Sequence, residues 1–223
     1  MAYGLPQVVE YDTSVIPPES NMYPTEWVHG CPIRLKIMLA NLNKHVMWSR
    51  TGITSDWQSL ERELLSWQPP NYIIPDEEAW KKVARLAVQE SWRHTLLIYL
   101  YMGVCGLASD DVRVSSSVRQ VFQIHDTVKH HLQLISKCSL LMQYLIAGAC
   151  TPNEKQRALV RESISYSVET VLWLFPLSNF VPVLDHLWHS AAAGGRPIRW
   201  SDYLHSRRTM LPVFSHDDGP FFC

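Results

Sequence analysis

Residues 76–106, DEEAWKKVARLAVQESWRHTLLIYLYMGVCG, form the longest uninterrupted helical pattern in the chain and decide its fold. In the first half of this stretch, apolar residues recur at helical spacing on one side and polar residues fall four apart on the other. From Thr95 onward the polar side disappears, and a soluble protein tolerates a helix that is apolar all round only where other helices pack around it. We therefore expect a helix that begins at the surface and ends in the core. The expected inward stripe is Trp80, Val83, Ala84, Ala87 and Val88, and the expected outward residues are Lys81, Arg85, Gln89 and Arg93.

The ends of this helix are also marked in the sequence. Asp76 follows Pro75 and is a good N-cap residue, and Glu77 and Glu78 add negative charge at the positive end of the helix dipole. Gly103 and Gly106 allow the helix to stop. The uncharged run 95–109 is shorter than the roughly 20 apolar residues that cross a bilayer, so we expect no membrane span.

The rest of the chain reads as further helices. A capping box at Ser55–Gln58 predicts one helix start, Asp110 and Asp111 read as caps of another, and Thr151-Pro152-Asn153-Glu154 predicts a third. No long alternation of polar and apolar residues demands a sheet. The fold class is therefore all-α, a single helical domain of about seven or eight helices around a buried central helix. The expected helices besides 76–106 cover 32–48, 55–67, 109–129, 132–150, 151–174, 179–193 and, less securely, 200–208.

Domain organisation follows from proline content and periodicity. Residues 1–25 carry four prolines with little periodicity, which favours an extended, proline-rich linker. We place the helical domain at residues 26–211 and a flexible tail at residues 212–223. A chain of 223 residues with 47% hydrophobic residues is long enough to bury a sizeable core as one domain.

Charge and cysteine content narrow the class of protein. The formal net charge is -1 and the pI is about 6.8, so the chain lacks the basic excess of a free-standing nucleic-acid binder. The five cysteines are widely spaced in apolar helical sequence, which indicates core thiols in a reducing compartment and excludes a zinc finger or zinc cluster. No secretory signal is visible at the N-terminus, so we expect an intracellular protein.

The sequence carries no catalytic motif, and we predict no enzyme, no metal site and no cofactor, with cofactor-binding residues unassigned. His186 and His189 beside Asp185 lie about one turn apart, but an ordinary helix face is the favoured interpretation; His125, His130 and His131 are weaker candidates still. The nine tryptophans indicate core packing more often than a ligand cavity. One stretch is locally basic, and we interpret it as a solvated face: Arg196, Arg199, Arg207 and Arg208.

Three segments together resemble the fungal-specific transcription factor domain. They are EWVHGCP at 26–32, EAWKKVARLAVQESWRHTLLIYLYMGVCGLASDDVRV at 78–114, and LDHLWHSAAAGGRPIRWSDYL at 184–204. The likeness spans roughly residues 26–211, and the central segment is its most specific part. The resemblance implies an all-helical regulatory region of the kind found downstream of zinc-cluster DNA-binding modules, although the six-cysteine module itself is absent from these residues.

From this resemblance we expect a regulatory and protein-interaction domain of a nuclear transcription factor, without catalysis. Expected partners are proteins of the transcription machinery or a second copy of the chain, with no direct nucleic-acid binding by this chain, no membrane contact, and a small molecule as a candidate effector. The alternative is a helical small-molecule-binding protein or enzyme with an aromatic-rich pocket. We also expect the helix at 32–48, apolar on more than one side, to expose a broad apolar face and cause self-association.

Overall fold

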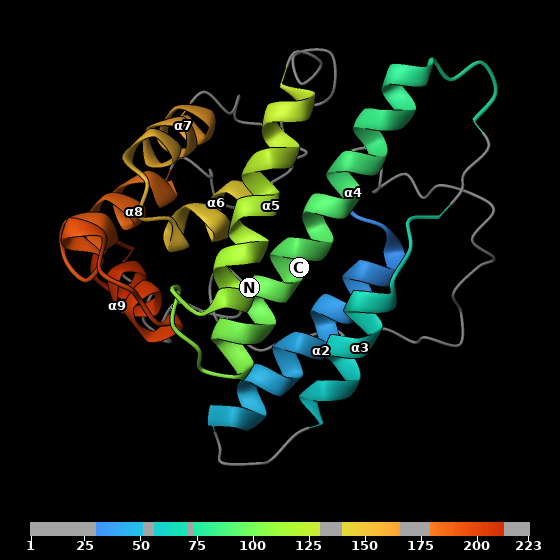
Figure 1. The fold of residues 1–223 in the computed structure, drawn as a ribbon. Coiled ribbons are helices and arrows are strands. Elements are labelled where there is room, and N and C mark those ends of the chain that lie inside the picture. The colour runs from blue at the N-terminus through green and yellow to red at the C-terminus, as the bar shows by residue number, and fades with distance from the viewer. Residues whose placement is uncertain (1–29, 51–55, 71–73, 130–139, 166–178, 212–223) are drawn as a thin grey trace, which may run out of the picture.

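The central pair of helices, α4 and α5, runs antiparallel through the middle of the molecule (Figure 1). The computed structural model describes residues 30–50, 56–70, 74–129, 140–165 and 179–211, and for residues 47–50 it describes the backbone alone. These residues form eight α-helices and no strand, so the all-α prediction is confirmed. The helices are α2 (Ile33–Arg50), α3 (Trp57–Ser66), α4 (Ala79–Tyr99), α5 (Val112–Val128), α6 (Leu141–Cys150), α7 (Glu154–Ser165), α8 (Phe180–His189) and α9 (Trp200–Met210).

Two groups of helices cover this central pair. Helices α2 and α3 pack against one side of α4, while α6 to α9 form a second group against α4 and α5 (Figure 1). Within the second group, α6 contacts α4, α5, α7 and α8, and α8 packs on α9. The core is therefore continuous from α2 to α9, and α4 and α6 are its most central elements.

The buried half of α4 matches its sequence pattern. Leu96, Ile98 and Leu100 are fully buried, and the helix continues as a π-helical turn over Leu100–Val104. Gly103 lies in this turn with Tyr99 and Val46 close by, and Gly106, at a φ of 67°, ends it. The prediction of a helix that ends in the core is confirmed.

The surface half of α4 differs from the prediction in three places. Asp76 is not the N-cap: it has a φ of 56°, and the helix begins three residues later after Glu78. Val83 was expected inside but is 56% exposed, whereas Gln89 was expected outside and is buried. Helical spacing locates an apolar stripe only to within about one residue on either side, and the packing of neighbouring helices decides its edges.

The starts of α3 and α7 also lie later than predicted. Asp56, not Ser55, caps α3 by accepting a hydrogen bond from the amide of Ser59. At α7, Asn153 rather than Thr151 accepts from the first-turn amides, and Glu154 bonds to a side chain instead of closing a capping box. Several oxygen-bearing residues stand in a row at each site, and the backbone conformation selects which of them caps.

At α5 the prediction holds for one aspartate. The side chain of Asp111 accepts a hydrogen bond from the amide of Arg113 at 2.9 Å and caps the helix. Asp110 makes no such bond and lines a cavity instead.

The predicted exposed apolar face on the first helix is wrong for its described side chains. Leu35, Met38 and Leu42 are buried in the core, and Ile37 and Leu39 are half-buried. Helices α3 and α4 and the π-helical turn cover α2 on the sides that the sequence left apolar. Self-association remains a prediction, but this helix no longer provides a reason for it.

Some predictions fall outside the described residues: the linker 1–25, the tail 212–223, His130 and His131, Cys138 and Cys223, and the predicted helical residues 132–139 and 166–174. Across the part of the chain that is described, no helix has the length and apolar character needed to cross a membrane.

Candidate functional site

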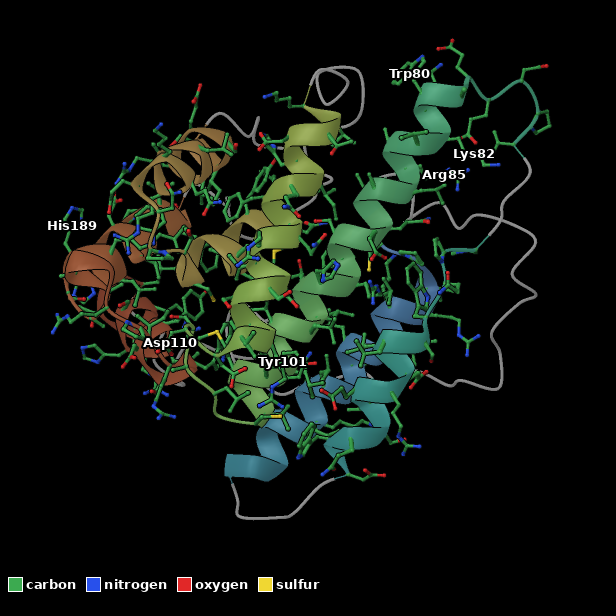
Figure 2. The ribbon with its side chains drawn as sticks, viewed as in Figure 1. Trp80, Lys82, Arg85, Tyr101, Asp110 and His189 are labelled. Atoms are coloured by element: carbon green, nitrogen blue, oxygen red, sulfur yellow. The ribbon has the colours of Figure 1, made fainter. Side chains whose placement is uncertain are left out.

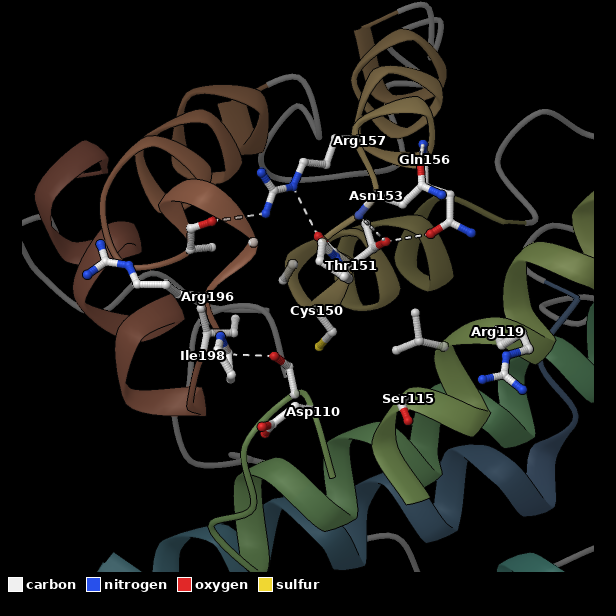
Figure 3. Close-up of a pocket in the computed structure, with 17 residues that line it drawn as sticks. Asp110, Ser115, Arg119, Cys150, Thr151, Asn153, Gln156, Arg157, Arg196 and Ile198 are labelled. Carbon is white, nitrogen blue, oxygen red and sulfur yellow. Dashed lines mark hydrogen bonds between the residues drawn. The ribbon is translucent and has the colours of Figure 1, made fainter. Parts of the chain in front are cut away.

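A cavity of about 420 Å³ lies where the first turns of α5, the α6–α7 connection and the segment before α9 meet (Figure 3). Its wall combines apolar side chains with a few polar and charged groups, which is the usual make-up of a small-molecule site. The lining residues are Ser109, Asp110, Ser115, Val118, Arg119, Ala149, Cys150, Thr151, Pro152, Asn153, Gln156, Arg157, Ala192, Gly195, Arg196, Pro197 and Ile198.

The start of α7 is tied down by its own side chains. Asn153 Oδ1 accepts from the amides of Lys155 and Gln156 at 2.9 and 3.4 Å. Thr151 Oγ1 accepts from the amide of Asn153 at 3.2 Å and also contacts the side-chain oxygen of Gln156. The amides of Asn153, Lys155 and Gln156 are thus already bonded, which leaves few backbone donors for a ligand.

Arg157 fixes the two walls of the cavity to each other. Its guanidinium donates to the backbone oxygen of Thr151 at 3.0 Å and to that of Ala192 at 3.2 Å, and also pairs with Glu154 at 2.6 Å. The side chain is only 5% exposed and lies beside the Trp188 ring. A buried charge is tolerated only when it is paired and hydrogen-bonded, as here, so we interpret Arg157 as a structural strut.

The opposite rim is held by backbone bonds. The amide of Ser109 donates to the backbone oxygen of Ile198 at 2.8 Å, and the amide of Ile198 returns a bond to Ser109 Oγ at 3.0 Å. Arg196 bonds to the backbone oxygens of Ala193 and Ser190, and its guanidinium points away from the cavity (Figure 3). These bonds make the cavity a defined feature of the fold rather than a gap between loops.

Two charged side chains of the lining have no partner among the residues that the structure describes. Arg119 on α5 and Asp110 before α5 make no side-chain hydrogen bond or ion pair with the described residues. They lie at different edges of the cavity in Figure 3, with Ser115 near Arg119. The cavity therefore has a cationic end and an anionic end, both accessible to water.

The lining lacks a reactive nucleophile. Burial raises the pKa of the Cys150 thiol to about 12, and its sulfur lies 3.1 Å from Met102 Sδ. A thiol with such a pKa stays protonated at neutral pH and reacts poorly. Ser115 Oγ donates to the backbone oxygen of Val112, and no histidine is among the lining residues to act as its base. The cavity can bind a molecule but is not arranged for acyl transfer.

The histidines considered for a metal do not converge. His186 Nδ1 contacts Ser206 Oγ at 3.0 Å, whereas His189 Nδ1 contacts the backbone oxygen of Asp185 at 2.7 Å. His125 is buried against Tyr144. Among the residues that the structure describes, no three His, Cys, Asp or Glu side chains form a group suited to a metal ion.

The basic stretch near the C-terminus is largely part of the fold. Arg207 is buried, so the interpretation of a solvated face is wrong for this residue. Arg199 donates to the backbone oxygen of Gly106 but is exposed, in agreement with that interpretation. Arg208 is exposed, as expected (Figure 2 shows the side chains of this region).

The aromatic-rich pocket of the alternative hypothesis is not this cavity, because none of the described residues that line it is aromatic. A more open groove beside α3 and α4 contains Trp67, with Leu65 and Ile124. Sequence reasoning missed Arg119 because a lone exposed arginine on a helix carries no local signal of a site. The predicted helix start at 151–154 was the nearest sequence signal of this cavity, because it marks an ordered turn of the chain that forms part of the wall.

Comparison with known proteins gives one result for the chain as a whole. The model of the fungal specific transcription factor domain matches residues 6–213. The chain belongs to this family. The match covers the helical region predicted at 26–211 and extends beyond it at the N-terminal side. Searches of the curated proteins and of the solved structures found no match to the chain.

Proposed function

We propose that this chain is a regulatory and protein-interaction domain of a fungal transcription factor, which acts in the nucleus through the transcription machinery or a second copy of itself. The match of the family model to residues 6–213 is the observation that carries the proposal. Membership of this family supports a regulatory role, and the family is generally non-enzymatic.

The charge of the chain supports the further proposal that it does not contact DNA by itself. Phosphate neutralisation needs a cluster of free lysines and arginines, but the net charge here is -1. In the one basic stretch, Arg196 and Arg199 are bonded to backbone oxygens and Arg207 is buried. We therefore expect only weak, salt-sensitive DNA binding.

The proposed lack of catalysis rests on the cavity. Its thiol is protonated, its serines donate to or accept from backbone groups, and its one buried arginine is a strut. These groups support binding and positioning rather than nucleophilic chemistry.

A reporter assay tests the regulatory role. We expect the chain, fused to a heterologous DNA-binding domain in a fungal host, to raise or lower expression of a reporter that carries the matching site. Leu145→Asp, which places a carboxylate at a fully buried position, should unfold the domain and remove the effect. Glu162→Ala, an exposed change on α7, should leave the effect intact. Equal reporter expression with the wild-type fusion and the DNA-binding domain alone would contradict the proposal.

A binding assay tests the second part. Gel-shift titrations of the purified chain should show no affinity for promoter DNA beyond that for random DNA at physiological salt. Tight, sequence-specific binding by the chain alone would show that it reads DNA itself.

A further inference from the structure

We propose that the cavity between α5, the α6–α7 connection and residues 192–198 binds a small monocarboxylic acid with an apolar body, and that Arg119 receives the carboxylate. Binding is a property of the folded chain and does not depend on the regulatory function proposed above. If that function holds, the acid is an effector of the domain.

Within the described part of the chain, Arg119 is the cation of this cavity that makes no side-chain bond. Of the three arginines in the lining, Arg157 donates to Thr151 and Ala192, and Arg196 donates to backbone oxygens outside the cavity. Arg119 makes no such contact with a described residue. It projects from α5 beside Ser115 at the cavity edge (Figure 3).

The donor geometry favours a carboxylate over a phosphate group. A guanidinium presents two parallel N–H groups that match the two oxygens of a carboxylate. A phosphate site usually adds several backbone amides or a second cation. Here the amides of Lys155 and Gln156 in the first turn of α7 are bonded to Asn153, and Ser115 Oγ donates to the backbone oxygen of Val112. The cavity therefore offers one planar fork and few other donors.

The remaining wall favours an apolar body. Val118, Ala149 and Ile198 line the cavity, and the Cys150 thiol is buried and protonated. Pro152 and Pro197 add further apolar surface without free N–H groups. A volume of about 420 Å³ lies within the range of small-molecule sites and accommodates a chain or ring of several carbon atoms.

Asp110 disfavours a ligand that carries a second carboxylate. Asp110 is exposed and has no ion-pair partner among the described residues. It precedes the first residue of α5, whereas Arg119 lies seven residues after that first residue. A rise of 1.5 Å per residue places Arg119 roughly 10 Å along the helix from the first residue of α5, which Asp110 precedes. A second carboxylate at the far end of the ligand would face the carboxylate of Asp110, and like charges repel. A monocarboxylate avoids this repulsion.

The experiment uses three molecules of the same length: octanoate, the dicarboxylate suberate, and 1-octanol. Titration of the whole chain, followed by saturation-transfer NMR, gives an apparent Kd for each. Because Arg119 and Asp110 are exposed and screened by solvent, we expect octanoate to bind in the micromolar to millimolar range. Suberate and 1-octanol should bind at least about tenfold more weakly, since each loses a charge-assisted contact or gains a repulsion.

Substitutions test the separate roles of Arg119 and Asp110 in binding. Arg119→Gln should weaken octanoate binding about tenfold and leave 1-octanol unchanged, while Arg119→Lys, which keeps the charge but not the planar fork, should be intermediate. Asp110→Asn should improve suberate more than octanoate. Arg208→Gln, an exposed change on α9, is the matched control and should alter none of the three. Melting temperatures confirm that each variant is folded.

Three results would overturn the proposal: no saturable octanoate binding by the wild-type chain in the millimolar range, equal binding by wild type and Arg119→Gln, or equal affinity for octanoate and suberate. A normal reporter response with no acid binding would overturn this proposal alone and leave the regulatory function standing. Acid binding with no reporter response would overturn the regulatory function and leave the carboxylate site standing.

Discussion

Gly148 is the position where a single methyl group should disturb the packing of three helices. An ideal Cβ at Gly148 on α6 would lie 2.7 and 2.9 Å from the two methyl carbons of Val160 on α7. These distances are well below van der Waals contact, and Val160 is fully buried, so its side chain has little room to move. The backbone oxygen of Gly148 also accepts a bond from Trp188 Nε1 on α8 at 3.0 Å.

Two opposing effects set the magnitude of Gly148→Ala. Alanine in a helix is favoured over glycine by roughly 0.5–1 kcal/mol. Overpacking a close-packed core costs about 1–3 kcal/mol. Overpacking wins because the short distances involve both methyl groups of Val160, and we expect a net loss of about 1–2 kcal/mol in the free energy of unfolding. For a chain of this size the melting temperature should fall by roughly 2–8 °C.

A double-mutant cycle separates steric conflict from a general effect on the helix. Val160→Ala alone should cost about 2–3 kcal/mol through lost burial and a cavity. In the double variant, the methyl group at position 148 occupies part of that cavity, so the combined cost should be lower than the sum by about 1 kcal/mol. Urea denaturation measures all four corners, and Glu162→Ala is the exposed control on α7. Additive costs, or a Gly148→Ala variant more stable than wild type, would refute the packing argument.

Three further predictions concern the surroundings of the cavity and the core. Arg157→Met should lower the free energy of unfolding by about 2–4 kcal/mol, because two buried backbone oxygens lose their donor, and faster amide exchange around Ala192 would locate the loss; unchanged stability would contradict the role as a strut. Burial lowers the pKa of His125, so the unfolded chain takes up this proton more readily than the folded one. The associated stability is therefore complete above the ordinary histidine pKa of about 6.5 and is lost as the pH falls through the folded pKa; NMR titration should place the His125 midpoint below 6.5, and a midpoint above it would reverse the sign. Asp111→Ala should lower the melting temperature by removing the cap on α5, and Asp111→Ser should restore most of the loss, because serine is also a good N-cap residue. Equal melting temperatures for the two variants would contradict the capping role.

The candidate site lay mostly beyond what the sequence could predict. Its lining comes from residues 109–119, 149–157 and 192–198, which are far apart in the chain and carry no shared motif. Arg196 belonged to a basic stretch in the sequence, but the backbone oxygens that bind its guanidinium became apparent only in the fold. Arg119 is important only because Arg157 and Arg196 are engaged elsewhere, and that is a property of tertiary contacts.

The helix ends also show what the sequence could predict and what only the tertiary structure decides. The capping residues Asp56 and Asn153 each lie within two residues of the predicted cap. Several adjacent side chains there have an oxygen able to accept an amide hydrogen. The sequence therefore limits the N-cap to a few residues but does not show which of them caps the helix. Gln89 is buried because α4 is enclosed more widely than its apolar stripe alone requires.

The sequence by itself determined the all-helical class, the central helix and its burial, because the change from a two-sided to an all-apolar helical pattern permits only burial on every side. It also carried the resemblance to a family that the match over residues 6–213 then established. Tertiary structure decided which apolar faces are covered, such as that of α2. It also decided which charged side chains are bonded within the protein, such as that of Arg157. The physical reason is that periodicity reports the environment of one helix, whereas a cavity and a free charge arise from what several helices leave unfilled and unpaired where they meet.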